Sequence, residues 1–495
     1  MSLYLLGIDI GTSACRATLF TPDGVVVAQA NEEYAVDCPR PGWAQQQPDM
    51  WWQAICHTVS AILSKNSIRP ETIAGIGVGG QSWSAVALDA QGRVLLPTPI
   101  WTDTRSIAEC DAVKRLVPEQ ELFELCGNPL QPGYTLPKIL WYKNHCREAY
   151  DNAAAILQSN SFIVYRLTGV MTQDLSQGYG LCCFDTRRGQ WDYQMAARLG
   201  LRSGLLPDIV PSHAVVGKVQ RAATLATGLC EGTPVVAGGL DAACGTLGAG
   251  VISHGQTQEQ GGQAGGMSLC IDRYISDPRL ILGFHVVPER WLLQGGTTGG
   301  GGAFKWLRKT VCPHLSFEEM SACADTVPPG SDGLIFLPYM AGERSPIWNP
   351  EAKGVFFGLD YQKTTPHLIR AVMEGVAFAL RHNLETAERA GANPDVLSAM
   401  GGSANSPVWT QIKSDVTGHR VQVRASDTAT AWGAAMLAGV GVGLFKNFED
   451  VVGHTVPMKR EHTPDAKHQA VYDKRYADYR ELYERLKPMM AAEES

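Results

Sequence analysis

Several features that would quickly assign a chain to a class of protein are missing from this sequence. The 13 cysteines form no Cys-x-x-Cys pair, which argues against a structural zinc site. No apolar run is long enough to cross a membrane, and no block of basic residues accompanies the formal net charge of −7. We therefore expect neither a membrane nor a nucleic acid as a partner. The absence of a Gly-x-x-x-x-Gly-Lys-Ser/Thr segment excludes a P-loop ATPase.

The cysteines that are present are odd in number and lie in apolar surroundings, as at Cys182 and Cys183. This usage favours reduced thiols and a cytoplasmic protein, as does an N-terminus without a basic region and a long apolar core. With 495 residues the chain is too long for one core. We expect an α/β protein of two domains, covering residues 1–245 and 246–495. The 52 glycines occur in clusters, which allow a backbone to approach a ligand closely.

The first predicted hairpin is the most informative segment of the chain. An apolar run at residues 5–10 is interrupted only by Asp9, and the turn Gly11-Thr12-Ser13 separates it from a second apolar run. Successive N–H groups in such a turn form an anion site, to which hydroxyl groups add further donors. A carboxylate at the same place repels a bare phosphate but can hold the Mg²⁺ that accompanies a nucleotide. The hairpin therefore predicts ATP chemistry beside Asp9.

One glycine pattern is a decoy. Residues 72–80 are predicted to form a buried strand and contain Gly75-x-Gly77-x-x-Gly80, formally a dinucleotide-binding fingerprint. That fingerprint must open a helix, whereas a second strand is predicted to follow at residues 85–89. We therefore reject a dinucleotide site.

The second half of the chain carries further glycine-rich turns. Residues 256–271 resemble the N-terminal hairpin, with a turn at 262–264, and so suggest a duplicated domain. Glycine runs at 295–302 and 401–402 each follow a predicted strand and precede a predicted helix. Glycine-rich backbone at the N-terminus of a helix suits an anionic ligand, and a simple mobile loop is the alternative.

Together these segments resemble the FGGY family of carbohydrate kinases, and the resemblance covers nearly the whole chain. It rests on the stretches Gly7-Ile8-Asp9-Ile10-Gly11-Thr12-Ser13, Pro41-Gly42-Trp43-Ala44-Gln45-Gln46-Gln47-Pro48-Asp49, Ile100-Trp101-Thr102-Asp103-Thr104-Arg105, Val236-Ala237-Gly238-Gly239-Leu240-Asp241, Leu337-Pro338-Tyr339-Met340-Ala341-Gly342-Glu343-Arg344-Ser345-Pro346, Gly354-Val355-Phe356-Phe357-Gly358-Leu359 and Gly401-Gly402-Ser403. No single stretch is specific, but their order and spacing together are. Within the family the pattern is closest to that of the xylulose kinases.

The resemblance implies a particular fold. Two ribonuclease-H-like domains, of the type found in actin and hexokinase, would be separated by a cleft. The sugar would bind mainly to the first domain and ATP mainly to the second. Closure of the cleft would exclude water, since a kinase with an open site would hydrolyse ATP.

Two aspartates carry the implied chemistry. By resemblance, Asp241 is the general base that accepts the proton of the substrate hydroxyl as the phosphoryl group is transferred. The alternative is a residue that only caps the following helix, and both roles can hold at once. Asp9 is the implied organiser of Mg²⁺ and phosphate. An ordinary turn aspartate fits this position poorly, because an unpaired charge within an apolar strand is costly.

The resemblance also assigns binding residues. For ATP and its phosphates these are Gly11, Thr12, Ser13, Arg16, Gly262, Gln263, Gly300, Gly301, Gly401, Gly402 and Asn405. For the sugar they are Gln81, Ser82, Trp83, Trp101, Asp103 and Arg105. An aspartate can bind two sugar hydroxyls, and an indole can cover the apolar face of a carbon skeleton. The alternatives are a surface arginine at position 16 and plain core packing for the tryptophans at positions 83 and 101.

The chain departs from the xylulose kinase pattern at three places. Gln81-Ser82-Trp83-Ser84 stands where those kinases usually read Gln-Met-His-Gly, and Ala242 follows the base where they usually have Asn. Both departures change the expected sugar contacts and point to a different sugar rather than a weaker enzyme. The turn Gly262-Gln263-Ala264 replaces Gly-Thr-Ser. This replacement alters the phosphate site, although backbone amides could serve whatever the side chain.

We therefore expect an ATP- and Mg²⁺-dependent kinase acting on a hydroxyl of a small ketose or polyol, with D-xylulose to xylulose 5-phosphate as the first expectation. One alternative is another substrate of the family, such as ribulose, erythritol or an autoinducer-type ketone. A second is a nucleotide-binding sugar sensor with little turnover, against which the retention of Asp9 and Asp241 argues. A chaperone-type or filament-forming ATPase would not need the loop from Trp101 to Arg105. A homodimer is plausible, but the sequence does not show one.

Overall fold

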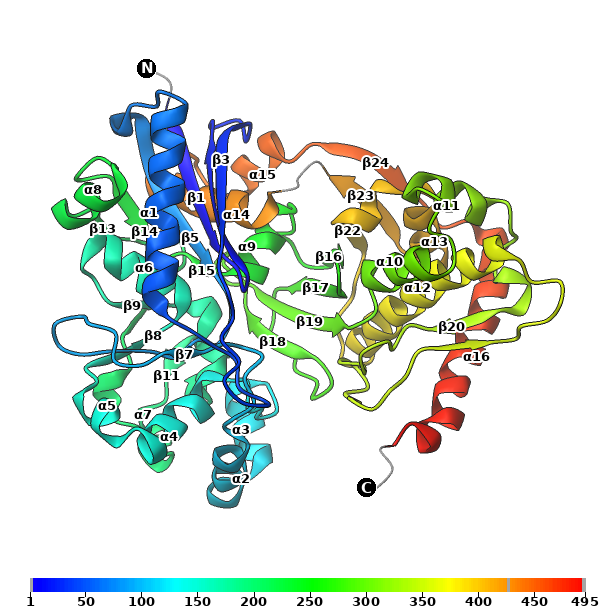
Figure 1. Ribbon diagram of the computed structural model, residues 1–495, viewed down its shortest axis with the longest axis horizontal. Helices are drawn as coiled ribbons and strands as arrows, with labels where there is room; N and C mark the ends of the chain where they lie inside the picture. Colours follow the sequence, from blue (N-terminus) through cyan, green and yellow to red (C-terminus); the bar gives the residue numbers. More distant parts are fainter. Residues whose placement is uncertain (1–2, 425–427, 492–495) are drawn as a thin grey trace.

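The computed structural model describes residues 3–424 and 428–491, and its two large mixed sheets lie side by side (Figure 1). The strands are β1 Tyr4–Ile10, β2 Ala14–Phe20, β3 Val26–Glu33, β4 Gln45–Gln46, β5 Ile73–Gly80, β6 Val86–Leu88, β7 Thr98–Pro99, β8 Ala155–Leu157, β9 Thr172–Asp174, β10 Phe184–Asp185, β11 Gln190–Trp191, β12 Asp208–Val210, β13 Val215–Lys218, β14 Pro234–Val236, β15 Gly239–Leu240, β16 Gln256–Gly261, β17 Gly265–Ile271, β18 Ile281–Phe284, β19 Trp291–Thr297, β20 Ile335–Leu337, β21 Val355–Phe357, β22 Val396–Met400, β23 Arg420–Arg424 and β24 Met458–His462.

The α-helices are α1 Pro48–Lys65, α2 Ile107–Leu116, α3 Glu119–Cys126, α4 Thr135–His145, α5 Arg147–Asn152, α6 Ser159–Thr168, α7 Tyr193–Arg198, α8 Arg221–Thr227, α9 Asp241–Gly248, α10 Gly301–Thr310, α11 Phe317–Asp325, α12 Thr365–Arg389, α13 Pro407–Thr417, α14 Ala429–Gly441, α15 Phe448–Thr455 and α16 Ala466–Met490. Short 3-10 helices are η1 Pro70–Thr72, η2 Leu175–Leu181, η3 Ser203–Leu205, η4 Ser331–Gly333 and η5 Gly402–Asn405.

The first sheet is built on the predicted N-terminal hairpin. Its order is β13-β14-β5-β1-β2-β3, with β15 also paired to β5. β2 runs antiparallel to both β1 and β3, and β5 lies parallel to β1. The hairpin register places Asp9 opposite Arg16.

The second sheet repeats this arrangement. Its order is β18-β19-β17-β16-β22-β23-β24, in which β16, β17 and β19 are antiparallel and β22 is parallel to β16. Each sheet therefore contains three antiparallel strands followed by a strand parallel to the first of them, as the predicted duplication requires. We call each sheet with its flanking helices a lobe.

Helices cover both faces of the first sheet. α1 packs on β2 and β3, while α14 packs on β1, β5 and α9 on the side toward the second lobe (Figure 1). In sequence α14 follows β23 of the second sheet, so the chain returns to the first lobe before β24 rejoins the second sheet. The predicted domain division between residues 245 and 246 stays a prediction.

The contact between α14 and the first sheet is backbone against backbone. A Cβ added to Gly7 would lie 1.9 Å from the carbonyl oxygen of Ala431, and one added to Gly77 would lie 1.9 Å from that of Ala434. As predicted, no helix follows β5, because the next element is β6. Glycines of the apparent dinucleotide fingerprint therefore make room for α14.

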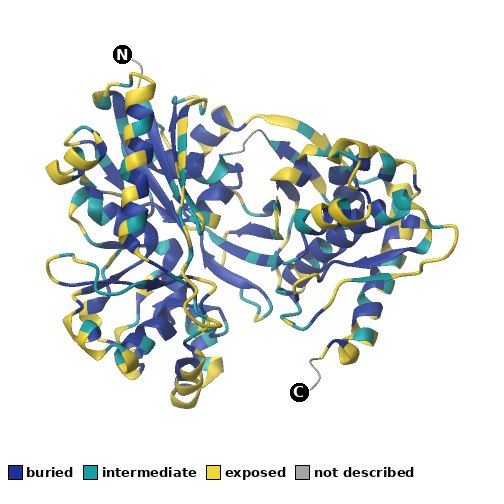
Figure 2. Cartoon of the chain, in the orientation of Figure 1, coloured by how far each residue is buried: buried dark blue, intermediate teal, exposed yellow. Residues whose placement is uncertain are grey.

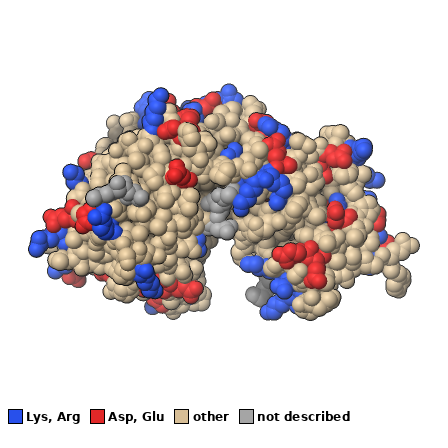
Figure 3. Space-filling view, turned by 90° about the horizontal axis from the view of Figure 1, so that it is seen from above, with Lys and Arg blue, Asp and Glu red and all other residues tan. Residues whose placement is uncertain are grey.

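The buried residues are concentrated in and around the two sheets. Their strands are largely buried, whereas the outward faces of the surrounding helices are exposed (Figure 2). The face seen in Figure 3 carries scattered charges of both signs and a notch between the two lobes. Among the helices of residues 3–424 and 428–491, none is long and apolar enough to span a membrane.

We predict that Gly77→Ala lowers the melting temperature strongly. The added methyl group must push α14 away from β5, and overpacking of this kind typically destabilises a protein by about 1–3 kcal/mol or more. Thermal unfolding followed by circular dichroism measures the shift.

Gly453→Ala in α15 is the matched control. Nothing lies within 4 Å of a Cβ at this exposed helical position. Alanine favours a helix over glycine by up to about 1 kcal/mol, so the control should keep or raise the melting temperature. Equal melting temperatures for Gly77→Ala and the unmodified protein would show that α14 is not tightly held.

Candidate active site

Two aspartates emerge at the same edge of the first sheet. Asp9 lies near the end of β1, and Asp241 directly follows β15. Gly79 of β5 is opposite both Asp9 and Gly239 in the register, so the two aspartates flank the end of β5. The carboxyl ends of parallel strands are a common place for ligand sites in α/β proteins.

Both carboxyl groups have raised pKa values. Burial raises the pKa of Asp9 to about 6, opposed by the positive charge of Arg16. Burial also raises the pKa of Asp241 to about 7, and the negative charge of Asp9 adds to the effect. A carboxylate whose pKa lies near neutral pH is suited to accept a proton from a substrate hydroxyl, because its deprotonated form is populated and is more basic than an ordinary carboxylate.

Asp241 is the first residue of α9, whereas the capping position is occupied by Leu240, so Asp241 is not the cap that the alternative predicted. Its Oδ1 accepts a hydrogen bond of 2.6 Å from the backbone N–H of Ala242. This contact uses one oxygen, and the residue is only half-buried. The position at the start of a helix is therefore compatible with the role of a base.

The turn after β1 is tight and internally bonded. Gly11 N–H donates to the carbonyl of Ala14 at 3.0 Å, and the Tyr34 hydroxyl donates to the Gly11 carbonyl at 2.7 Å. Ser13 is exposed, and its carbonyl accepts from the Tyr34 N–H at 2.9 Å. The predicted phosphate turn thus has a fixed shape and an open face.

A cavity of about 580 Å³ lies in the second lobe. Five of the predicted nucleotide residues line it: Gly262, Gln263, Gly301, Gly402 and Asn405. Much of the remaining wall is apolar and comes from α10, α11 and α13: Phe304, Phe317, Ala322, Pro407, Val408 and Trp409. An apolar slot bordered by glycine turns suits a flat heterocyclic base with a phosphate tail.

A second cavity, of about 290 Å³, connects this slot to the first lobe. Asp9 and Arg16 line it on one side, and Gly401 lines it on the other. It shares Gly262, Gly402 and Asn405 with the larger cavity. Arg16 is exposed, as its alternative predicts, yet it borders the same space as Asp9. The two cavities therefore adjoin each other, one at the apolar slot and the other at Asp9.

Gly300 supports the site without lining either cavity. A Cβ there would lie 2.4 Å from the carbonyl carbon of Ala264, so only glycine allows this loop to approach the turn. The next two N–H groups, of Gly301 and Gly302, donate to the carbonyls of Gly262 and Gln263 at 2.7 and 2.9 Å. The altered turn therefore keeps its shape through backbone bonds.

Lys413 is a buried lysine that the sequence analysis missed, and it is bonded to residues beside two of these glycine turns. Lys413 Nζ donates to Glu259 Oε1 and to Ser403 Oγ, both at 2.7 Å. Glu259 lies on β16 before one glycine turn, and Ser403 lies in η5 after another. In the sequence Lys413 is one of several polar residues in a predicted helix, which reveals neither its burial nor its partner.

On the sugar side, three predicted residues meet around one hydroxyl group. Trp101 Nε1 donates to Thr12 Oγ1 at 2.8 Å, and Thr12 Oγ1 donates to Gln81 Oε1 at 3.3 Å. Gln81 Nε2 in turn donates to Gln46 Oε1 at 2.9 Å, a partner that the sequence analysis missed. These hydrogen bonds directly join Thr12 of the predicted phosphate turn to the predicted sugar-binding residues Trp101 and Gln81. Trp101 is exposed, so core packing does not describe it.

Trp83 lies in an aromatic cluster. Its ring centroid is 4.6 Å from that of Tyr134 and 5.8 Å from that of Tyr179. Its backbone has a φ of 54°, a left-handed conformation that is rare for a bulky residue, and its carbonyl accepts from Lys138 Nζ at 2.7 Å. Trp83 and Ser82 are both half-buried. Trp83 therefore packs within the aromatic cluster and also keeps exposed surface that a ligand can contact.

The other two predicted sugar ligands are not brought to the cleft. The side chains of Asp103 and Arg105 are 0% and 3% exposed and form a 2.8 Å ion pair. Asp103 Oδ2 also accepts from the Ala44 N–H at 2.7 Å, and the Arg105 guanidinium lies 3.8 Å from the ring centroid of Trp43. Arg105 Nη2 also donates to Gln45 Oε1 at 2.8 Å. The geometry does not support direct sugar contacts, because the polar atoms of this pair are bonded to each other and to the neighbouring loop.

Comparison with known proteins identifies the family to which the chain belongs. The model for the FGGY family of carbohydrate kinases, N-terminal domain, matches residues 4–248, and that for the C-terminal domain matches residues 272–442. The chain belongs to the FGGY family of carbohydrate kinases. It is 32% identical over 489 residues to a xylulose kinase of Escherichia coli (strain K12), covering 98% of this chain and 100% of that one.

Solved structures agree with the family. A xylulose kinase from Rhodospirillum rubrum superposes with a TM-score of 0.90 at 30% identity, covering 98% of this chain and 99% of that chain. A gluconate kinase from Lactobacillus acidophilus superposes with a TM-score of 0.91 at 25% identity, covering 98% of both chains. The predictions of two α/β domains of this fold and of an ATP-dependent sugar kinase are confirmed.

We predict that Arg105→Met destabilises the protein by about 3–5 kcal/mol, because it leaves the buried carboxylate of Asp103 without its partner. Urea unfolding followed by tryptophan fluorescence measures the loss. The control is Arg40→Met, an exposed arginine whose guanidinium lies 5.1 Å from the ring centroid of the same Trp43. Full stability of Arg105→Met with a raised KM for sugar would instead make Arg105 a sugar ligand.

We predict that Asp241→Asn raises the melting temperature of the ligand-free protein in alkaline buffer. The folded pKa of about 7 exceeds the ordinary 3.8, so the folded state binds more protons between these values and stability falls as pH rises through them. Asparagine removes that loss. The gain should be larger at about pH 8 than at about pH 5, and absent for Asp151→Asn on the surface. A pH-independent gain would contradict the raised pKa of Asp241.

Proposed function

We propose that this sugar kinase transfers the γ-phosphoryl group of ATP to a hydroxyl of D-xylulose. The observation that carries the proposal is the pair Asp9 and Asp241 at one sheet edge, with Asp9 lining a cavity that adjoins the apolar slot. The choice of sugar rests on the xylulose kinase relatives, which align over nearly the whole chain. A cytoplasmic location and a homodimer stay predictions.

The nucleotide fits the two cavities in one orientation. The base lies in the apolar slot of the second lobe, where Asn405 offers both donor and acceptor groups to its edge. The phosphates run through the smaller cavity toward the first lobe. Backbone N–H groups of the turns at Gly11 and Gly262 and the charge of Arg16 then surround the γ-phosphate.

The proposed Mg²⁺ site depends on the nucleotide. Among residues 3–424 and 428–491, no group of three or more His, Cys, Asp or Glu side chains could hold a metal ion alone. Mg²⁺ is usually bound by one or two carboxylates together with substrate phosphates, and Asp9 in the smaller cavity suits that arrangement. When bound, the ion would neutralise charge on the phosphates.

Asp241 performs the proton step. The sugar hydroxyl approaches from the side of Trp83 and Trp101, and Asp241 accepts its proton as the oxygen attacks the phosphorus. Closing the lobes around the sugar excludes water and so suppresses hydrolysis of ATP. The negative charge of Asp9, which raises the pKa of Asp241, is countered once cations occupy the phosphate site.

A second candidate substrate is D-gluconate. Trp83 and Ala242 depart from the usual xylulose kinase pattern at positions expected to contact sugar, and a gluconate kinase superposes as well as a xylulose kinase does. The fold alone does not separate these substrates, since sugar specificity depends on a few side chains in the cleft.

The test is ADP release by the purified protein with MgATP and a panel of ketoses, aldoses, polyols and D-gluconate. We expect turnover that depends on D-xylulose, and a loss of about 10²–10⁴-fold in kcat for Asp241→Ala, the usual contribution of a general base. Asp151→Ala, a change at an exposed aspartate, should keep full activity.

Each outcome separates the alternatives. Turnover of another sugar keeps the kinase and the base but replaces the substrate. Sugar binding without turnover favours the sensor, and ATP hydrolysis indifferent to sugar would refute a sugar kinase. Full activity of Asp241→Ala would refute the base.

A further inference from the structure

The loop between β20 and β21 is fixed at one point on β19. Ser345 Oγ donates to the Gly296 carbonyl at 3.1 Å and accepts from the Gly296 N–H at 2.6 Å. Glu343 Oε1 accepts from the N–H groups of Thr298 and Arg344, both at 2.7 Å. The backbone of Arg344 therefore has a defined position, although no role was assigned to it from sequence.

The guanidinium of Arg344 lies against the β19 backbone. A Cβ on Gly296 would be 2.5 Å from Arg344 Nη2, so a glycine is needed for the side chain to lie there. The residue is half-buried, and burial lowers its pKa. Among residues 3–424 and 428–491 this guanidinium makes no hydrogen bond or ion pair.

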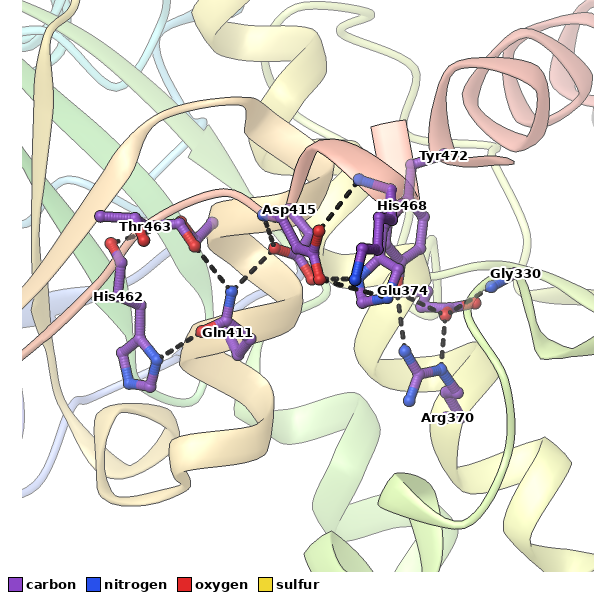
Figure 4. Close-up of polar contacts among 12 residues, drawn as sticks. Gly330, Arg370, Glu374, Gln411, Asp415, His462, Thr463, His468 and Tyr472 are labelled. Carbon is purple, nitrogen blue, oxygen red and sulfur yellow. Dashed lines mark hydrogen bonds and ion pairs between the residues drawn. The ribbon is translucent and has the colours of Figure 1, made fainter. Parts of the chain in front are cut away.

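Arg370 shows what a structural arginine of the same lobe looks like. Its Nε donates to Glu374 Oε1 at 2.8 Å and its Nη2 to the Tyr472 hydroxyl at 2.8 Å (Figure 4). Its Nη1 donates to the Ala324 carbonyl at 3.1 Å. Every nitrogen of that guanidinium has an acceptor. Unpaired donors become costly once water leaves them, so those of Arg344 indicate an acceptor supplied by a ligand.

The surroundings of Arg344 place it on the sugar side of the cleft. Tyr179 is within electrostatic range of both Arg344 and Asp241, since the first lowers and the second raises its pKa while burial dominates. Tyr179 also packs on Trp83. Arg344 lines neither of the two nucleotide cavities. The ring of Tyr179 also lies against β18, where a Cβ on Gly283 would be 3.0 Å from its Cε1, and β18 pairs with β19, whose Gly296 contacts Arg344. A ligand held at this place, outside the nucleotide cavities, is the acceptor sugar.

We propose that Arg344 is a sugar-binding residue contributed by the second lobe, whose guanidinium donates to two oxygen atoms on the end of the substrate away from the phosphorylated hydroxyl. This inference rests on the proposed function. A guanidinium fork pairs best with two neighbouring acceptors. The substrate class is thus a short chain ending in paired oxygens, either the carbonyl and hydroxyl of a ketose or the carboxylate of an aldonate.

The test compares Arg344→Met and Arg344→Lys with the unmodified protein in ADP-release assays on D-xylulose and D-gluconate. We expect the KM for the sugar to rise about 10–100-fold in Arg344→Met, the size of a lost charge-assisted hydrogen bond, with the KM for ATP unchanged. Lysine keeps the charge without the fork, so it should recover part of the loss with a carboxylate substrate and little with a ketose. The control is Arg389→Met, an exposed arginine of α12.

Gly296→Ala tests the same contact without changing the arginine. The new methyl group displaces the flexible guanidinium, so the KM for sugar should rise while the fold is kept. An unchanged KM for sugar in Arg344→Met and Gly296→Ala would overturn the inference. If the unmodified protein phosphorylates no sugar, the proposed function fails, and calorimetric binding of the same two sugars decides the inference. Weaker binding by Arg344→Met supports it, whereas equal binding, or none to either protein, overturns it.

Discussion

The site depends on how closely α14 and α9 lie against the first sheet. Glycines at the contacts allow backbone atoms of the helices to touch backbone atoms of β1 and β5, as at Gly7 and Gly77. Such packing leaves little freedom for the strand ends, where Asp9 and Asp241 emerge. Burial raises the pKa of both carboxyl groups, and the negative charge of Asp9 raises that of Asp241 further. The chemistry of the site is thus a consequence of backbone packing several residues away.

Much of this arrangement is predictable from sequence because it is local. The N-terminal hairpin with its aspartate, the strand ending at Asp241, and the glycine turns before helices each follow from short patterns. The same patterns placed most of the nucleotide residues on the two adjoining cavities. The rejected dinucleotide fingerprint is equally local, because the element that follows a strand decides it.

The parts that sequence could not predict depend on partners distant in the chain. Asp103 and Arg105 share a motif with the exposed Trp101, and nothing in the residue types shows that only the tryptophan faces the cleft. The pairing of Lys413 with Glu259 joins positions 154 residues apart. Arg344 was visible only as part of a family motif. Its neighbours Gly296 and Tyr179 come from separate strands and turns.

The path of the chain between the lobes has one more consequence. The polypeptide leaves the first lobe after α9, returns to it as α14, and leaves again after α15 to form β24. Three covalent connections therefore join two bodies. A single linker would permit relative rotation of the lobes in any direction, whereas three connections restrict it mainly to rotation about a line that passes near them. The cleft would then open and close essentially by rotation of one lobe relative to the other about a single axis.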